Sequence, residues 1–474
     1  MDKFCTPPRG GPPDCLDCGY PQETAGLSQL LEHVVVTRID GKHLAWAAAL
    51  ALLLGFCGGL RAERPEPREW FAGDPHVHRG IGCARSDADR MLTPEELLEM
   101  MRPNDLDVIS VLGDMGNGEI REAAEDLKLI DGKDHPQSSG GRILHWDAEW
   151  HFDPKGVTFE QKAIGGHLIV LGLRHARTIY YEYTHPLIEW AQRQGAVVGF
   201  AHMQYLPEGF PEKMTCCDPL EYPVEVALGS GVFLMEDVRG SEPWTDHYYR
   251  LLNCGFRPGL AAGTDYPCDS KPLPPLGNLL TYVRVADGKL TYRKWIDGIA
   301  SGRTVISRSG HSEFLDLKVN GKAGPGDEVK LRRAGRVRVD VAWSANRPLS
   351  GRVDLVQNGE VVASREATVL PGRPQSIVES IEFQRSGWIC ARRVDETGHV
   401  VHTSAAFVSV GGKPVRASAR DAQFFVQYLD RLLEKTAAGG EWGSYFSSQR
   451  EEAQARYRAA RAVYQRIAEE AARF

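Results

Sequence analysis

The hydrophobic positions between about residue 70 and residue 308 alternate between helical spacing and short apolar runs. Thr93-Pro94-Glu95-Glu96 predicts a helix start, because threonine caps helices well and proline suits the first helical position. The runs that predict buried strands are 107–112, 167–173, 196–201 and 258–263, and the helices between them are 185–193 and 246–252. Alternating helix and strand predicts an α/β fold with βα units around a parallel sheet or barrel.

The periodicity changes after about Ser312. Leu315, Leu317 and Val319 alternate with polar residues, and Asn358-Gly359 lies between two apolar runs, which is a strong hairpin signal. We therefore expect a β-sandwich over residues 312–412. Residues 413–474 return to helical spacing and predict a C-terminal helical pair. Its apolar stripes, which must be buried against other elements, contain Phe424, Phe425, Tyr428, Leu429, Leu432, Leu433, Tyr457, Ala460, Tyr464 and Ile467.

One segment near the N-terminus has membrane character. Leu44–Leu60 is an apolar run of 17 residues that follows Arg38 and Lys42. Its length suits either a signal segment or an N-terminal anchor helix. Because a signal peptide normally begins close to its basic residues, we hypothesise a true start near Val34–Val36 and take residues 1–33 as a gene-model artefact. Either interpretation makes residues 1–62 a lead segment and predicts an extracytoplasmic protein.

Composition narrows the function classes. The chain has 474 residues, which suggests two to three domains, and 42% hydrophobic with 25% charged residues is an ordinary globular balance. The net charge of −7 provides no broad basic surface, so we expect no nucleic-acid partner.

Cysteine usage is consistent with export. Of ten cysteines, four lie within about 50 residues of one another, namely Cys216, Cys217, Cys254 and Cys268. They would form one or two disulfides in an oxidising compartment, and the spacing does not determine the pairing.

Candidate metal ligands lie near the ends of the predicted strands. His76 and His78 are two residues apart, so on a strand their imidazoles point to the same side. The other candidates, in chain order, are Glu149, His167, His202 and Asp265. Either of the two later histidines alone is better explained as a capping or core residue. The whole series is harder to explain in that way, because βα folds place their chemistry at strand ends.

The motifs GDPHVH, EWH, GGHLIVLGL, GFAHMQ and AAGTDY resemble, in this order, those of PHP-domain metallohydrolases, nearest the CehA/McbA-like branch. The resemblance covers roughly residues 70–410. It implies a distorted (βα)7-type barrel, over residues 63–311, that binds transition-metal ions, followed by the β-sandwich. One implied ion would be held by His76, His78, Glu149 and Asp265, and a second by Glu149, His167 and His202.

Three positions depart from the family pattern. Gly113-Asp114-Met115 stands where a TDH-like motif is usual, and a thioether does not replace imidazole for zinc or manganese. Thr264-Asp265-Tyr266-Pro267 replaces the usual SDxH, and Cys83 falls where another ligand is usual, with Asp87 and Asp89 as substitutes. These departures imply that a third metal site is absent or remodelled. We therefore expect two divalent ions, of zinc, manganese or iron.

These observations predict an exported metal-dependent hydrolase that cleaves a phosphoester, ester or carbamate-type bond in a small-molecule or glycan-linked substrate. Asp74 and Asp114 would orient metal-bound imidazoles. Arg79 would stabilise a leaving group or be an exposed loop arginine, and Tyr266 would bond an oxyanion or merely pack. His151 is an additional ligand candidate, with a solvated loop histidine as the alternative.

The rival hypothesis is a non-catalytic secreted binding protein. In that case the barrel has decayed and the β-sandwich recognises a glycan or a surface. A sandwich that only buttresses the barrel is a third alternative. Neither the oligomeric state nor the substrate follows from the sequence.

Overall fold

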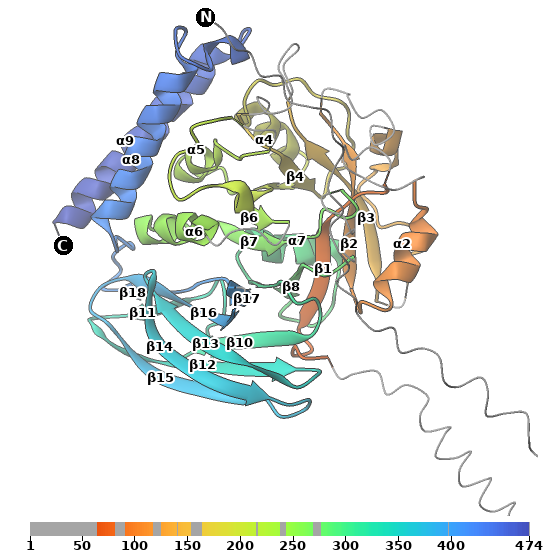
Figure 1. Ribbon diagram of the computed structural model, residues 1–474, viewed down its shortest axis with the longest axis vertical. Helices are drawn as coiled ribbons and strands as arrows, with labels where there is room; N and C mark the ends of the chain where they lie inside the picture. Colours follow the sequence, from red (N-terminus) through yellow and green to blue (C-terminus); the bar gives the residue numbers. More distant parts are fainter. Residues whose placement is uncertain are drawn as a thin grey trace, which may run out of the picture. The chain divides into compact units, whose positions relative to one another are not determined.

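Seven strands carry the region of the candidate ligands (Figure 1). They are β1 (Trp70–Val77), β2 (Val108–Asp114), β3 (Ile143–Trp150), β4 (Leu168–Leu171), β5 (Val197–Phe200), β6 (Phe233–Glu236) and β7 (Gly259–Ala262), and together we call them the site sheet. The computed structural model describes residues 64–80, 91–116, 125–139, 141–152, 164–214, 217–237, 243–268, 276–396 and 398–473. The predicted signal or anchor segment lies outside these residues. Among the described residues, no helix combines the length and apolar character needed to cross a bilayer.

The site sheet is mixed rather than parallel, which corrects the expectation of uniform βα units. β1, β2 and β3 pair in parallel, and so do β5, β6 and β7. β4 runs antiparallel to both β3 and β5. The start of β4 therefore lies at the sheet edge where its neighbours end.

The end of β7, the last strand of the site sheet, lies beside the end of β1, the first. Val77 forms a parallel bridge with Tyr266, just beyond β7. The hydroxyl of Thr281, in β8 (Leu280–Arg284), donates to the carbonyl oxygen of Ala262 and accepts from its N–H, each at 2.8 Å. β8 in turn pairs antiparallel with β1. The ends of β1 and β7 are thereby held side by side, although a single bridge joins them.

Helices cover both faces of the site sheet. Helix α7 (Tyr292–Ala300) packs Trp295, Ile296 and Ile299 against one face, in a buried cluster that includes Leu112 of β2. The remaining helices beside the site sheet are α2 (Pro94–Met101), α4 (His185–Gln192), α5 (Tyr222–Ala227) and α6 (Pro243–Cys254), with the 3-10 turns η1 (Asp126–Leu129) and η3 (Met203–Tyr205). The predicted start of α2 is confirmed, since Thr93 and Glu96 form a capping box.

The C-terminal half contains the expected short strands. They are β9 (Thr304–Ser307), β10 (Glu313–Val319), β11 (Glu328–Leu331), β12 (Gly335–Ala345), β13 (Leu349–Gln357), β14 (Glu360–Val369), β15 (Gln375–Phe383), β16 (Gly387–Asp395), β17 (Gly398–Thr403) and β18 (Ala406–Val410). The predicted hairpin at Asn358-Gly359 is confirmed: it joins β13 to β14, and both residues have positive φ.

These strands form two sheets. β10, β12 and β15 form a sheet of three, whereas the others continue the large sheet. The connection is made by β17, which pairs with β9, and β9 pairs with β8. The β-rich half is therefore hydrogen-bonded to the site sheet rather than joined by a linker alone, and Ala62–Phe474 forms one compact unit.

The predicted helical pair is confirmed as α8 (Ala419–Thr436) and α9 (Arg450–Ala472), which lie side by side in Figure 1, joined through the turn η4 (Gly443–Tyr445). Phe425, Tyr457 and Tyr464 are buried. The hydroxyl of Tyr464 donates to the carbonyl oxygen of Pro223 at 2.9 Å, which attaches α9 to α5. The apolar stripes are thus buried against each other and against the preceding helices.

Histidine 247 in α6 gives the fold an expected acid sensitivity. Its Nε2 donates to the carbonyl oxygen of Pro207, and its Nδ1 accepts from the hydroxyl of Tyr222, both at 2.6 Å. Burial, reinforced by the positive charge of Arg250, lowers the pKa of His247 to about 4. Because protonation then favours the unfolded chain, this neutral histidine stabilises the fold above about pH 6.5 and less as the pH falls towards 4.

We expect His247→Gln to flatten the acid limb of stability. In the wild type, protonation of His247 should lower the free energy of unfolding by on the order of 3 kcal/mol between pH 6.5 and 4. Denaturant unfolding of wild type and variant at pH 7.5 and pH 4.5 measures the difference, and carboxylates common to both proteins cancel. Parallel loss of stability in the two proteins would show that the histidine is not the sensor.

Candidate metal centre

The structure brings all six candidate ligands together at one edge of the site sheet. His76 lies in β1, His78 follows it, and Glu149 lies in β3. His202 and Asp265 follow β5 and β7. His167 precedes β4 and reaches the same edge because β4 runs antiparallel to its neighbours.

The first group of ligand atoms contains two imidazoles and two carboxylates. Nε2 of His76 lies 3.1 Å from Nε2 of His78. Oδ1 of Asp265 lies 3.2 Å from each of these nitrogens. Oε2 of Glu149 lies 3.2 Å from Nε2 of His78, and its Oε1 lies 3.5 Å from Nε2 of His76.

The second group shares Glu149 with the first. Oε1 of Glu149 lies 2.8 Å from Nδ1 of His167 and 3.5 Å from Nε2 of His202. The two imidazole nitrogens are 3.1 Å apart. One carboxylate thus stands between two pairs of imidazoles, as a bridging ligand would.

These separations fit transition-metal ions. Ligands about 2.0–2.1 Å from a tetrahedral zinc ion are about 3.3–3.4 Å from one another. The distances between the two imidazoles of the first group, and from each carboxylate to these imidazoles, are 3.1–3.5 Å. Imidazole with carboxylate is also a donor set that suits zinc, manganese or iron.

The outer ring nitrogens of three imidazoles lie beside acceptor oxygens. Nδ1 of His76 lies 2.7 Å from Oδ1 of Asp237, and Nδ1 of His202 lies 3.0 Å from Oδ2 of the same carboxylate. Nδ1 of His78 donates to the carbonyl oxygen of Leu112 at 3.2 Å. A proton on Nδ1 leaves the lone pair of Nε2 directed towards the centre, which is the tautomer that a metal requires.

Asp237 is a residue that sequence reasoning missed. It follows the apolar run of β6 and is buried, and it also accepts from the backbone N–H of His202 at 2.7 Å. The signal was the same as for the other ligands, a polar residue directly after a buried strand. The strand β6, which carries the signal, was not among those singled out.

The electrostatics of the centre favour cations. Burial alone would raise the pKa of Glu149, but the imidazoles of His167 and His76 hold it well below its usual range. Burial alone would lower the pKa of His78, but Asp265 and Glu149 raise it to about 9. The carboxylates therefore stabilise positive charge at this position, whether protons or metal ions supply it.

Asp74 orders the backbone rather than an imidazole. Its Oδ1 accepts from the N–H groups of His76 and Thr264, at 3.1 and 3.0 Å, and its Oδ2 accepts from the Thr264 hydroxyl at 2.5 Å. Burial raises the pKa of Asp74 to about 6. A Cβ at Gly263 would lie 2.9 Å from Cβ of His76. These contacts clamp the chain before Asp265 against the end of β1.

Two candidate ligands have unusual backbone conformations. His202 has φ of 59° and Asp265 has φ of 49°. Residues other than glycine rarely adopt this left-handed region, and when they do, they cluster at functional sites.

Asp114 lies beside the second group without touching its ligands. Its Oδ1 accepts from the N–H of Gly116 at 2.7 Å and lies 3.3 Å from Nε2 of His151. The ring of His151 lies 4.9 Å from that of His167, and His151 is buried rather than solvated. Met115, which stands in place of the histidine of the usual TDH-like motif, is buried in the core. Asp114 therefore positions His151, not one of the six candidate ligands.

The side chain of Arg79 is held by neighbouring residues, and Tyr266 is bonded to His78 through its backbone. Nη1 of Arg79 donates to Asp126 at 2.7 Å, its Nε donates to the carbonyl oxygen of Leu92 at 2.6 Å, and its guanidinium lies over Trp146. The carbonyl oxygen of Tyr266 accepts from the N–H of His78 at 2.6 Å. Burial raises the pKa of its half-buried phenol. These contacts of Arg79 and of the Tyr266 backbone support the loop structure.

Two of the three clustered cysteines that the structure describes are oxidised. Cys217 and Cys268 are disulfide-bonded, which agrees with the expected disulfides. Cys254, which ends α6, is a buried free thiol and takes no part in a disulfide. Cys216, Cys83, Asp87 and Asp89 lie outside the described residues.

We expect Asp237→Asn to weaken both halves of the centre. Asp237 now presents one carboxylate oxygen to His76 and the other to His202. An amide has only one acceptor oxygen, so one of these imidazoles would face an N–H group in the variant. The affinity for metal should fall about 10–100-fold. Competition with a chromogenic chelator measures it, and Asp430→Asn, at an exposed ion pair, is the matched control. Wild-type affinity for both ions in Asp237→Asn would contradict this role.

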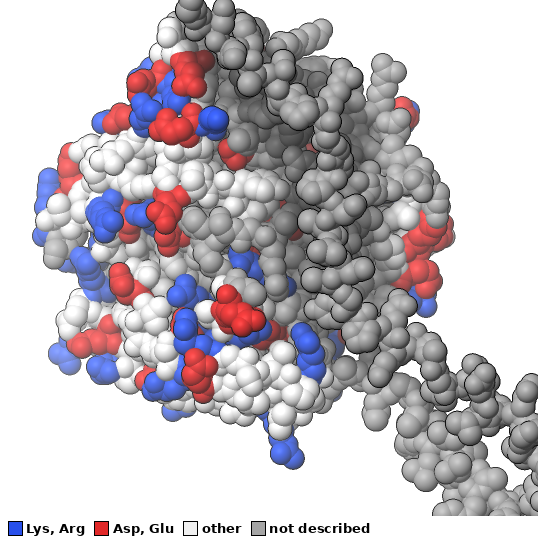
Figure 2. Space-filling model, viewed as in Figure 1, with Lys and Arg blue, Asp and Glu red and all other residues white. Residues whose placement is uncertain are grey.

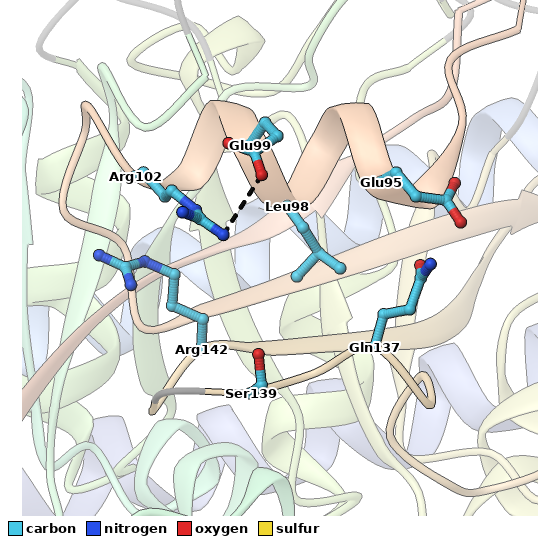
Figure 3. Close-up of a pocket in the computed structure, with 7 residues that line it drawn as sticks. All are labelled: Glu95, Leu98, Glu99, Arg102, Gln137, Ser139 and Arg142. Carbon is cyan, nitrogen blue, oxygen red and sulfur yellow. Dashed lines mark ion pairs between the residues drawn. The ribbon is translucent and has the colours of Figure 1, made fainter.

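Figure 2 shows basic and acidic residues interspersed over the described part of the face in view, without a large patch of one sign. A small pocket of about 190 Å³ lies at α2, where an ion pair joins Glu99 to Arg102 at 3.2 Å (Figure 3). Its other lining residues are Glu95, Leu98, Gln137, Ser139 and Arg142, so it contains none of the candidate ligands.

No protein-family model matches this sequence, and no curated protein matches it. Among solved structures, the CARDB domain of a Pyrococcus furiosus protein is 18% identical, over 21% of this chain and 95% of that chain, with a TM-score of 0.16. The sulfur carrier protein SoxY from Chlorobium limicola is 16% identical, over 20% and 78%, with a TM-score of 0.15. A β-glucosidase from Listeria innocua is 13% identical, over 22% and 16%, with a TM-score of 0.15. TM-scores this low carry no argument about fold or activity.

Proposed function

We propose that this protein is a metal-dependent hydrolase with a two-metal centre. The observation that carries the proposal is the position of Glu149 between the two groups of imidazoles. Its Oε2 lies 3.2 Å from Nε2 of His78, and its Oε1 lies 2.8–3.5 Å from ring nitrogens of His76, His167 and His202. His76, His78 and Asp265 would hold one ion with Glu149, and His167 and His202 the other. Bound there, two divalent ions would supply an activated water and a polarised bond for hydrolysis.

The protein's own groups prepare this centre. Asp237 and the Leu112 carbonyl keep the Nε2 atoms of three imidazoles available as ligands. Asp74 fixes the ends of β1 and β7 against each other, so His76 and Asp265 keep their spacing. Preorganised ligands cost little rearrangement when the ions and the substrate bind.

The wider assignment is also a proposal. The ordered motifs support membership of the PHP superfamily, near its CehA/McbA-like branch, with β1–β7 as a distorted barrel and β10–β18 as a sandwich. The bonds we expect to be cleaved are phosphoesters, esters or carbamates. The disulfide-bonded Cys217 and Cys268 support an extracytoplasmic location, because such bonds persist mainly in oxidising compartments.

A hydrolysis screen tests the proposal. Purified protein is assayed against chromogenic phosphodiester, carboxylester and carbamate substrates, before and after chelation and after reloading with zinc, manganese or iron. We expect turnover of at least one class that chelation abolishes and one of the metals restores. Metal-independent turnover, or none with any metal, would contradict the proposal. The second result would favour the non-catalytic binding protein.

A further inference from the structure

The sulfur of Cys217 lies beside the second pair of imidazoles. It is within 4.8 Å of the ligand nitrogens of both His167 and His202. The loop that carries it packs closely against the chain before β4, since a Cβ on Gly166 would lie 2.9 Å from the carbonyl oxygen of Cys217. Two imidazoles and one sulfur are a common donor set for a transition-metal ion.

The oxidation state of this sulfur decides whether it can be a ligand. Cys217 is disulfide-bonded, and a cysteine binds metal as a thiolate. In the oxidised protein the second group therefore offers imidazole and carboxylate alone. In the reduced protein the same group would have a thiolate next to it.

We infer that reduction of the Cys217 disulfide creates an additional metal ligand and converts this half of the centre to a His167-His202-Cys217 site for a soft or borderline ion such as zinc. The inference rests on the proposed function, because the two histidines are shared. A thiolate favours zinc over manganese, whereas carboxylate and imidazole accept either. The metal preference of the centre then depends on the redox state of its compartment.

The chemistry balances with a dithiol as the reductant. The disulfide accepts two electrons and two protons from the dithiol, its S–S bond breaks to give two thiols, and the dithiol becomes a disulfide. When Cys217 binds the ion, its S–H proton leaves to solvent.

Cobalt spectroscopy tests this inference. The protein is reduced with a dithiol, freed of reductant without air and titrated with Co²⁺, and the untreated protein is titrated in parallel. We expect a sulfur-to-cobalt charge-transfer band only after reduction. We expect Cys217→Ser to lack this band in both states. Cys254→Ala, which removes a buried free thiol, is the matched control and should keep the band.

The outcomes separate this inference from the proposed function. Cobalt binding without the sulfur band after reduction, or a band that persists in Cys217→Ser, would overturn the inference and leave the metal centre standing. No cobalt binding in either state would overturn both. Should the serine variant not fold, alkylation of the reduced wild type provides the test. Bound cobalt should slow modification of Cys217, mapped by mass spectrometry, and an unchanged rate would contradict the inference.

Discussion

Glu149→Gln is expected to lower metal-dependent hydrolysis by about 10³-fold, which corresponds to about 4 kcal/mol of transition-state stabilisation. Glutamine has nearly the same shape but only one oxygen ligand. It cannot serve both groups of imidazoles, which lie 2.8–3.5 Å from the two oxygens of Glu149. We therefore expect at most one tightly bound ion per chain in the variant. Steady-state kinetics and elemental analysis measure the two effects.

Glu366→Gln is the matched control, because Glu366 is exposed in β14. It should retain wild-type activity and metal content. Thermal melting of both variants separates loss of the centre from loss of the fold. A Glu149→Gln protein that keeps two ions and full activity would rule out a bridging role.

Arg308→Met is expected to lower the free energy of unfolding by about 3–5 kcal/mol. Nε and Nη2 of Arg308 donate to the two carboxylate oxygens of Glu236 at 2.9 and 2.7 Å, and both residues are buried. Removal of the guanidinium leaves a buried carboxylate without its counter-charge. The pair connects the end of β9 to the end of β6, next to Asp237.

Urea unfolding measures this effect against an exposed pair. Arg461→Met, which breaks the surface pair with Asp430, should cost less than about 1 kcal/mol. The double variant Arg308→Met/Glu236→Gln should recover part of the loss, because it also removes the stranded charge. If Arg308→Met and Arg461→Met lowered the free energy of unfolding equally, burial would not increase the cost of breaking the Arg308–Glu236 pair.

Local signals predicted the elements that the chain forms on its own. The capping box at Thr93 and Glu96 and the hairpin turn at Asn358-Gly359 are both confirmed. Each depends on residues a few positions apart, whose backbone preferences act before any long-range contact. The apolar stripes of α8 and α9 were predictable for the same reason, since helical period is a local property.

Pairing between strands was less predictable. The apolar run Leu168–Leu171 predicts a buried strand but carries no information about its direction. It pairs antiparallel with both β3 and β5, and the long connections on either side would have permitted either direction. The same is true of the bond between β9 and β17, which joins segments almost one hundred residues apart. These features depend on tertiary contacts that no short window of sequence contains.

The residues of the candidate site could be predicted where the end of a buried strand could be predicted. All six ligand candidates lie in or next to an end of a buried strand, and parallel neighbours bring such ends to one edge. His167 reached that edge for a different reason than expected, since β4 is reversed. Asp237 was missed because β6 was not among the predicted strands. The contacts of Arg79 with Asp126 and Trp146 were not predictable, because they join residues far apart in sequence.

Anomalous scattering from crystals of the zinc-loaded protein would locate the ions of the proposed two-metal centre. We expect two peaks, one within bonding distance of His76, His78 and Asp265, the other of His167 and His202, with Glu149 between them. No peak among these residues, or ions bound only elsewhere on the chain, would contradict this proposal.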